Sequence, residues 1–202
     1  MQPVLESTAD DSLVLHLGAV AQRMSDDEFF QFCMLHPDLR IERTSEGDLI
    51  IMSPTGGETG RRNFNLVGFL GNWVNGDGTG VGFDSSTVFK LPNGANRSPD
   101  VAWVRRERWE ALSPNERKKF PPLCPDFVLE LRSDSDRLAT LQKKMQEYID
   151  NGAQLGWLID PGQRKVWVYR ANSAVECLEN PVSVSGDPVL PGFVLLLESI
   201  WR

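Results

Sequence analysis

The alternation of apolar and polar residues changes period several times along this chain, and each change predicts an element. Alternating apolar and polar residues on both sides of a Ser-Glu-Gly turn predict a β-hairpin from residues 39–43 and 48–52. Apolar residues at helical spacing from 66 to 74 predict an amphipathic helix, which Asn75-Gly76-Asp77-Gly78 should end. Residues 26–36 predict a shorter helix that stops before Pro37.

The second half of the chain carries the clearest signals. Residues 127–131 predict a strand and residues 138–151 a helix, with Gly152 at the position where a glycine often ends a helix. Further strands are predicted at 81–91, 98–104, 155–159 and 165–169, two short helical turns within 106–120, and only short strands in the remainder. Helices and strands mixed in this way predict an α/β domain.

Composition limits the class of protein. The chain has 202 residues, 41% of them hydrophobic and 24% charged, which suits one globular domain at 23–202 after a loosely attached lead-in segment at 1–22. No aliphatic run is long enough to span a bilayer, and a secretory signal is not expected. Three cysteines at unrelated spacings indicate a reducing compartment, so we expect a cytoplasmic protein, and only two histidines make a zinc site improbable.

The net charge of -7 argues against broad, sequence-blind affinity for nucleic acid, because phosphate contacts need lysine and arginine. Local basic clusters weaken that argument. They are Arg61-Arg62, Arg105-Arg106 with Arg108, and Arg117-Lys118-Lys119. For any single cluster, the solvated face of a short helix is the simpler interpretation.

Two carboxylates stand inside apolar strand patterns. Asp100 follows Pro99 at the start of one predicted strand, and Glu130 lies within another. Burying a carboxylate is costly unless a cation or hydrogen bonds hold it. Lys144 lies at the edge of the apolar stripe of the following helix, so its ammonium can reach a nearby sheet end. Two acids and a lysine are the minimal set for a divalent-metal site that activates water against a phosphodiester.

Each of these residues also has a structural interpretation. Glu130 and Arg132 share one strand face and could form an exposed ion pair, and Asp100 could be a turn residue bonded to local amides. Asp126 fits that second role best, and Lys144 could simply extend its stem over apolar surface.

The polar residues at the helix starts have capping interpretations. Ser133-Asp134-Ser135-Asp136 should cap the helix that follows. Glu58 has capping-box spacing from Thr55, with a carboxylate of the metal site as the weaker alternative, and Gln142 flanks the apolar stripe and could face the site.

Several of these segments together resemble the Uma-type restriction-endonuclease-like family of the PD-(D/E)XK nuclease superfamily. The resemblance runs from about Met52 to Tyr169, on Ser98-Pro99-Asp100, Pro125 to Glu130, the lysine four residues before Tyr148, and Asn151-Gly152 with Trp157 to Pro161. It implies a restriction-endonuclease-like mixed β-sheet flanked by helices. The sequence departs from the superfamily pattern at Arg132, where the superfamily usually has a lysine two residues after the second acid. The family resemblance implies that Lys144 takes that role.

The resemblance implies metal-assisted hydrolysis of phosphodiester bonds. Asp100, Glu130 and a backbone carbonyl near Leu131 would hold Mg²⁺ or Mn²⁺, Lys144 would orient the attacking water or stabilise charge, and Arg132 would hold a phosphate. Superfamily habit implies a homodimer acting on duplex DNA. A catalytically inactive nuclease-fold protein that binds nucleic acid or a protein partner is the alternative, and an assembly protein whose acids only form salt bridges is a third hypothesis.

Overall fold

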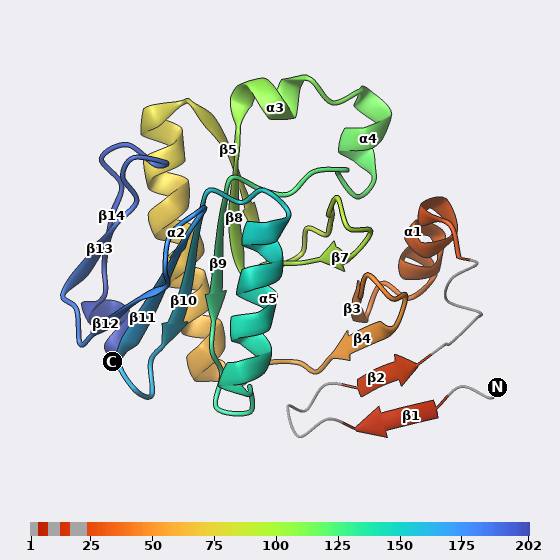
Figure 1. Ribbon diagram of the computed structural model, residues 1–202, viewed down its shortest axis with the longest axis horizontal. Coiled ribbons are helices and arrows are strands. Elements are labelled where there is room, and N and C mark those ends of the chain that lie inside the picture. The colour runs from red at the N-terminus through yellow and green to blue at the C-terminus, as the bar shows by residue number, and fades with distance from the viewer. Residues whose placement is uncertain (1–3, 8–12, 17–23) are drawn as a thin grey trace.

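The fold was analysed in a computed structural model, which describes residues 4–7, 13–16 and 24–202. Two six-stranded sheets and a short hairpin make up the β-structure (Figure 1). The first sheet has the order β1-β2-β4-β3-β7-β6, and the second β12-β11-β10-β9-β8-β5. The strands are β1 (Val4–Ser7), β2 (Leu13–His16), β3 (Arg40–Arg43), β4 (Leu49–Met52), β5 (Gly80–Asp84), β6 (Phe89–Lys90), β7 (Asn96–Arg97), β8 (Val101–Arg105), β9 (Phe127–Leu131), β10 (Leu155–Asp160), β11 (Lys165–Arg170), β12 (Glu176–Glu179), β13 (Ser183–Ser185) and β14 (Val194–Leu196).

The helices are α1 (Asp26–Leu35), α2 (Gly57–Asp77), α3 (Arg106–Glu110), α4 (Pro114–Lys118), α5 (Leu138–Asp150) and α6 (Glu198–Trp201). Two of them, α2 and α5, cover opposite faces of the second sheet, whereas α1 packs against the first sheet (Figure 1). On one face Leu66 and Leu70 of α2 pack against alternate residues of β8, β9 and β10, together with the C-terminal hairpin and α6. On the other face Met145 and Tyr148 of α5 pack against the intervening residues. The predicted mixed α/β fold, a sheet flanked by helices, is confirmed.

The centre of the second sheet is a β9-α5-β10 unit. The strands β9 and β10 are parallel, and every residue of both is buried. Strands covered on both faces read as nearly continuous apolar runs, which is why these two were visible in the sequence. Such runs also make Glu130 unusual, because it is an acid in a strand that offers no solvent-facing side. Strand β8 pairs antiparallel with β9 on its other edge.

Most predicted elements are confirmed within a residue or two, but several details are wrong. The single strand expected at 81–91 is interrupted by a turn between β5 and β6, and the strand at 98–104 begins only at Val101, after β7. The tail contains helix α6 as well as strands. The N-cap of α2 is Gly56, without a side-chain bond, and the N-cap of α5 is Arg137, so neither predicted cap exists. Asp136 instead accepts hydrogen bonds from Ser133.

Two short strands lie within the lead-in segment predicted at 1–22. The hairpin of β1 and β2 extends the first sheet, with Leu13 opposite Ile51 of β4 (Figure 1). The division into a lead-in and one domain at 23–202 stays a prediction.

Candidate active site

The pairing of β8 with β9 brings the two predicted acids together. Val101 lies opposite Leu129, and continuing this antiparallel register by one residue places Asp100 beside Glu130. Side chains directly opposite on neighbouring strands have Cβ atoms about 4.5–5.5 Å apart. Glu130 is 4% exposed, and Asp100 is partly buried at the start of β8. Two residues 30 positions apart in sequence therefore present carboxylates to the same spot.

Lys144 meets these acids from the helix that follows β9. Its Nζ lies 2.9 Å from Glu130 Oε1 and 2.9 Å from Oε1 of a third acid, Glu42. One helical turn further, the hydroxyl of Tyr148 donates to the same Glu130 oxygen at 3.0 Å. Residues four apart share one helix face, so the β9-α5 connection delivers both groups to Glu130. Lys143, by contrast, is exposed, as the helical pattern predicted.

Glu42 is the site residue that sequence reasoning missed. It lies on β3, is 2% exposed, and accepts from the backbone N–H of Ser98 at 2.8 Å in addition to Lys144. Its second oxygen accepts from Arg97 at 3.1 Å, and Arg97 also pairs with Glu147 of α5 at 2.6 Å. Both oxygens of Glu42 are thus occupied. Its role in the cluster is to hold Lys144 and Arg97, and in an ordinary alternating hairpin strand no sequence signal marks it.

Asp100 and Glu130, unlike Glu42, keep oxygen atoms available. Asp100 Oδ2 accepts from the backbone N–H of Leu131 at 2.8 Å, while Oδ1 has only a long 3.5 Å approach from Asn63 of α2. Glu130 Oε2 receives no hydrogen bond within the described part of the chain, since Lys144 and Tyr148 both use Oε1. The side-chain oxygen of Asn63 is buried without a partner. Asp100 Oδ1, Glu130 Oε2 and Asn63 Oδ1 are therefore the oxygens of this cluster that have no close hydrogen-bond donor within the described part of the chain.

The electrostatics indicate a shortage of positive charge at Glu130. Burial, together with the charges of Asp100 and Glu42, raises its pKa to about 7 against the opposing effect of Lys144. Burial also raises the pKa of Asp100, despite the Leu131 amide and the charge of Lys144. Burial would lower the pKa of Lys144, but Glu130 and Glu42 outweigh it and hold that pKa well above its usual range. Lys144 is therefore positively charged in the folded protein. A second positive charge beside Glu130 would offset the remaining negative charge of the acids.

These residues fit a magnesium-like ion. Mg²⁺ keeps several waters and takes one or two protein carboxylates plus substrate phosphate, so Asp100 Oδ1 and Glu130 Oε2 are a suitable oxygen set. Throughout the described ranges no group of three His, Cys, Asp or Glu side chains is arranged to hold a metal ion.

The other residues predicted for the site do not contribute to the pair of free oxygens, Asp100 Oδ1 and Glu130 Oε2. Arg132 bonds Asp160 at 2.6 Å and the Asp136 carbonyl at 3.0 Å, so it does not form the alternative ion pair with Glu130. Glu58 is exposed and pairs with Arg61 at 3.1 Å. Gln142 is partly buried on α5. Leu131 contributes its amide to Asp100, and a role for its carbonyl stays a prediction, as do the roles of Arg132, Glu58 and Gln142.

Asp126 has a structural role, but its partners are distant in sequence and are not the local amides that were expected. It is 3% exposed, accepts from the backbone N–H of Arg105 at 2.9 Å, and pairs with Arg108 at 2.9 Å. Two members of the second basic cluster are therefore directed at a buried carboxylate. Arg62 of the first cluster donates to the Ile200 carbonyl at 2.9 Å, which joins α2 to the C-terminal helix.

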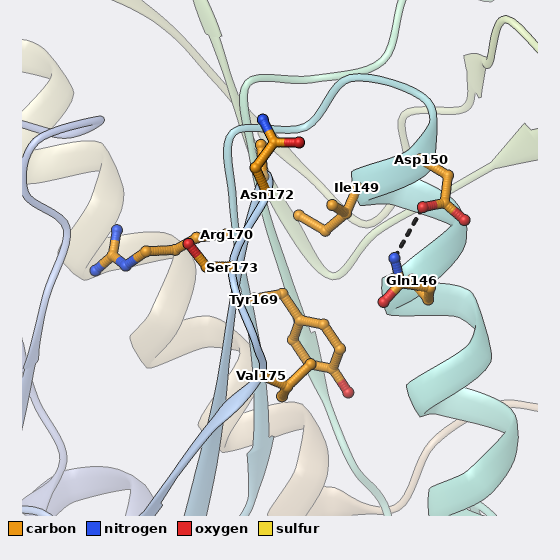
Figure 2. Close-up of a pocket in the computed structure, with 9 residues that line it drawn as sticks. Gln146, Ile149, Asp150, Tyr169, Arg170, Asn172, Ser173 and Val175 are labelled. Carbon is orange, nitrogen blue, oxygen red and sulfur yellow. Dashed lines mark hydrogen bonds between the residues drawn. The ribbon is translucent and has the colours of Figure 1, made fainter.

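A hollow of about 440 Å³ lies between the last turns of α5 and the residues at and after the end of β11 (Figure 2). It is formed by the last turns of α5, with Gln146 and Asp150, and by the end of β11, with Tyr169 and Asn172. Figure 2 shows Gln146 bonded to Asp150 along the helix, at 2.8 Å. Asp150 is the one acidic residue among those that line it, and Asp100, Glu130, Glu42 and Lys144 take no part in lining it. The acid cluster is therefore the better candidate for hydrolytic chemistry.

Fold and site together define a nuclease-like α/β protein. The family model described as "Putative restriction endonuclease", Uma2, matches residues 26–198, and the chain belongs to this family. The family named by the sequence resemblance is thereby confirmed. A crystal structure titled as a "putative nuclease belonging to DUF820" from Anabaena variabilis ATCC 29413 is similar, with a TM-score of 0.68 and 20% identity over 80% of this chain and 89% of that one. At this identity the likeness shows the fold. None of the curated proteins matches the chain.

Proposed function

We propose that this protein is a metal-dependent endonuclease that hydrolyses phosphodiester bonds of DNA. Membership of a restriction-endonuclease family supports the reaction class. The observation that carries the proposal is the convergence of Asp100 and Glu130 beside Lys144, with one carboxylate oxygen of each left without a close hydrogen bond. A bound Mg²⁺ or Mn²⁺ would supply a Lewis acid and a more acidic water in this position.

The residues of the chain have distinct tasks in this scheme. Asp100 and Glu130 would hold the ion, with Oδ1 and Oε2 free to do so, while the Leu131 amide and the Tyr148 hydroxyl fix the opposite oxygens. Lys144 is held between two carboxylates, which raise its pKa and favour its protonated form. Its charge orients Glu130 and stabilises negative charge that develops on the phosphoryl group.

One observation favours the alternative of a nuclease-fold protein that binds without cutting. The position two residues after Glu130 is Arg132, which always carries its proton and here bonds Asp160. Hydrolysis then depends on the ion and its water for proton removal, without help from a neighbouring neutral amine. A protein that binds metal and DNA but leaves the strand intact would have this alternative function.

The experiment is a cleavage assay on supercoiled plasmid and linear duplex, with Mg²⁺ or Mn²⁺ and with chelator. Wild type should nick only with the metal, and Glu130→Gln and Asp100→Asn should reduce the rate at least 100-fold while the circular dichroism spectrum is unchanged. Glu179→Gln, which removes an exposed carboxylate on β12, is the matched control and should cut normally. Metal-independent cutting, or full activity of Glu130→Gln, would rule out the proposal.

Two finer expectations belong to the same proposal. A homodimer on duplex DNA is expected from superfamily habit, and sedimentation with and without DNA tests it. A cytoplasmic location is expected because the three cysteines, Cys33, Cys124 and Cys177, are all free. No helix among the described residues is long and apolar enough to cross a membrane.

A further inference from the structure

Arg40 stands at the edge of the acid cluster, on the strand that carries Glu42. Side chains two residues apart on a strand share one face, so Arg40 points to the same side as Glu42. Glu42 is buried against Lys144, whereas Arg40, at the start of β3, is exposed. Within two residues the strand therefore passes from solvent, where Arg40 presents its guanidinium, to the buried centre of the cluster.

The pKa of Asp100 also indicates that Arg40 lies near the acids. The charge of Arg40 is among the groups that lower the pKa of Asp100, alongside the Leu131 amide and Lys144. The guanidinium therefore lies close enough to Asp100 to act on it through space, although no ion pair joins the two. A ligand bound on the solvent side of Asp100 would therefore lie near the guanidinium of Arg40.

Arg40 differs from the other arginines around the acids in having no partner of its own. Arg97 is shared between Glu42 and Glu147, and Arg132 bonds Asp160 and a backbone carbonyl. Within the described part of the chain Arg40 makes no hydrogen bond or ion pair. An exposed guanidinium with all its donors free is suited to two parallel hydrogen bonds with a phosphate.

We propose that Arg40 binds a backbone phosphate of the nucleic-acid strand presented to Asp100 and Glu130. This inference rests on the proposed function and names the residue that receives the substrate. A protein of net charge -7 needs a local cation to bring a polyanion against buried carboxylates. The exposed, unpaired guanidinium beside the acids meets that need, and the paired Arg132 does not.

Arg170 provides a matched control. It pairs with Leu155 at the beginning of β10, which in turn pairs with Phe127 at the beginning of β9, three residues before Glu130. Arg170 lies on the same strand face as Val166 and Val168, which face α2. It therefore lies on the opposite side of the sheet from Glu130. Figure 2 shows its side chain extending away from α5. Arg40→Gln and Arg170→Gln each remove one positive charge.

The test measures binding of a fluorescently labelled DNA duplex by anisotropy, in Ca²⁺ to prevent cleavage, over a series of salt concentrations. Arg40→Gln should raise Kd about tenfold, because a charge-assisted phosphate contact is lost. The slope of log Kd against log salt should fall by about 1, as expected for one phosphate fewer. Arg170→Gln should leave both values unchanged. Tm should match wild type in both variants, and Mn²⁺ affinity should not fall in either, so neither a folding defect nor a weakened metal site can produce the result.

Equal Kd and equal slope for Arg40→Gln and Arg170→Gln would overturn the inference while leaving the nuclease proposal intact, provided that wild type still cuts DNA. Absence of DNA binding by wild type would also overturn it. Calorimetry with Mn²⁺ then decides separately whether the metal site, and with it the proposed function, survives.

Discussion

Replacing Glu130 with glutamine should stabilise the metal-free protein at neutral and alkaline pH, although it removes one partner of a salt bridge. Glutamine is nearly isosteric with protonated glutamate and can still accept from Lys144 and Tyr148. What it removes is a negative charge that lies close to two others, those of Asp100 and Glu42. The variant therefore isolates the free energy of keeping Glu130 ionised.

The magnitude follows from the pKa. Burial and neighbouring acids raise the pKa of Glu130 from 4.5 to about 7. Between these pH values the folded protein binds more protons than the unfolded chain, so wild-type stability falls as the pH rises through this window. The difference of about 2.5 pH units corresponds to about 3 kcal/mol at pH 8 and to almost nothing at pH 4. For a domain of this size that is about 6–12 °C in Tm.

The assay is urea unfolding, followed by tryptophan fluorescence with chelator present, at several pH values from 4 to 8.5. The difference between Glu130→Gln and wild type should be near zero at pH 4 and grow to about 3 kcal/mol at pH 8. Mg²⁺ at 100 times Kd should then stabilise wild type by about 2.7 kcal/mol and leave the variant unchanged. A variant that is equally or less stable at pH 8 would refute the idea of an acid cluster short of positive charge.

Three further substitutions test other parts of the structure. Lys144→Gln should abolish metal-dependent nicking and lower the free energy of unfolding at pH 8 by about 3–5 kcal/mol, because it leaves buried carboxylates unpaired; unchanged stability in urea would contradict the network. Arg132→Gln should lower the free energy of unfolding by a similar amount, about 3–5 kcal/mol, because it leaves the buried carboxylate of Asp160 unpaired. Mn²⁺ affinity should be unchanged in calorimetry, and a large loss of that affinity would instead place Arg132 in the metal site. Gly80→Ala should cost about 1–3 kcal/mol, since a Cβ would lie 2.2 Å from the Trp103 ring, and a neutral effect in thermal unfolding would show that the ring can move.

The parts of the fold that could be predicted are those with a strong and local signal. The strand β9 and the helix α5 are such cases, because a buried apolar strand and an amphipathic helix each impose their own period. The interruption between β5 and β6 could not be predicted, since the turn residues there also fit an extended strand. The caps of α2 and α5 were wrong because capping spacing in a sequence does not fix where the helix begins.

The candidate site was predictable only where its residues stand out locally. Asp100 and Glu130 are acids in apolar surroundings, and Lys144 lies at a stripe edge, so each could be singled out. Their meeting depends on the antiparallel register of β8 and β9, which no local pattern specifies. Glu42 and Arg97 come from the other sheet, and their roles arise only when β3 and β7 pack beside α5. Asn63, on α2, could not be recognised for the same reason.

The central claim is that Asp100 and Glu130 form one binding site for a divalent cation. Isothermal calorimetry with Mn²⁺ at pH 7.5 tests it most directly, on wild type, Asp100→Asn, Glu130→Gln and the control Glu179→Gln. We expect one ion per chain for wild type and the control, with protons released because Glu130 is partly protonated before binding. Both site variants should lose the binding while staying folded. Absence of binding by wild type, or equal binding by all four proteins, would contradict the account.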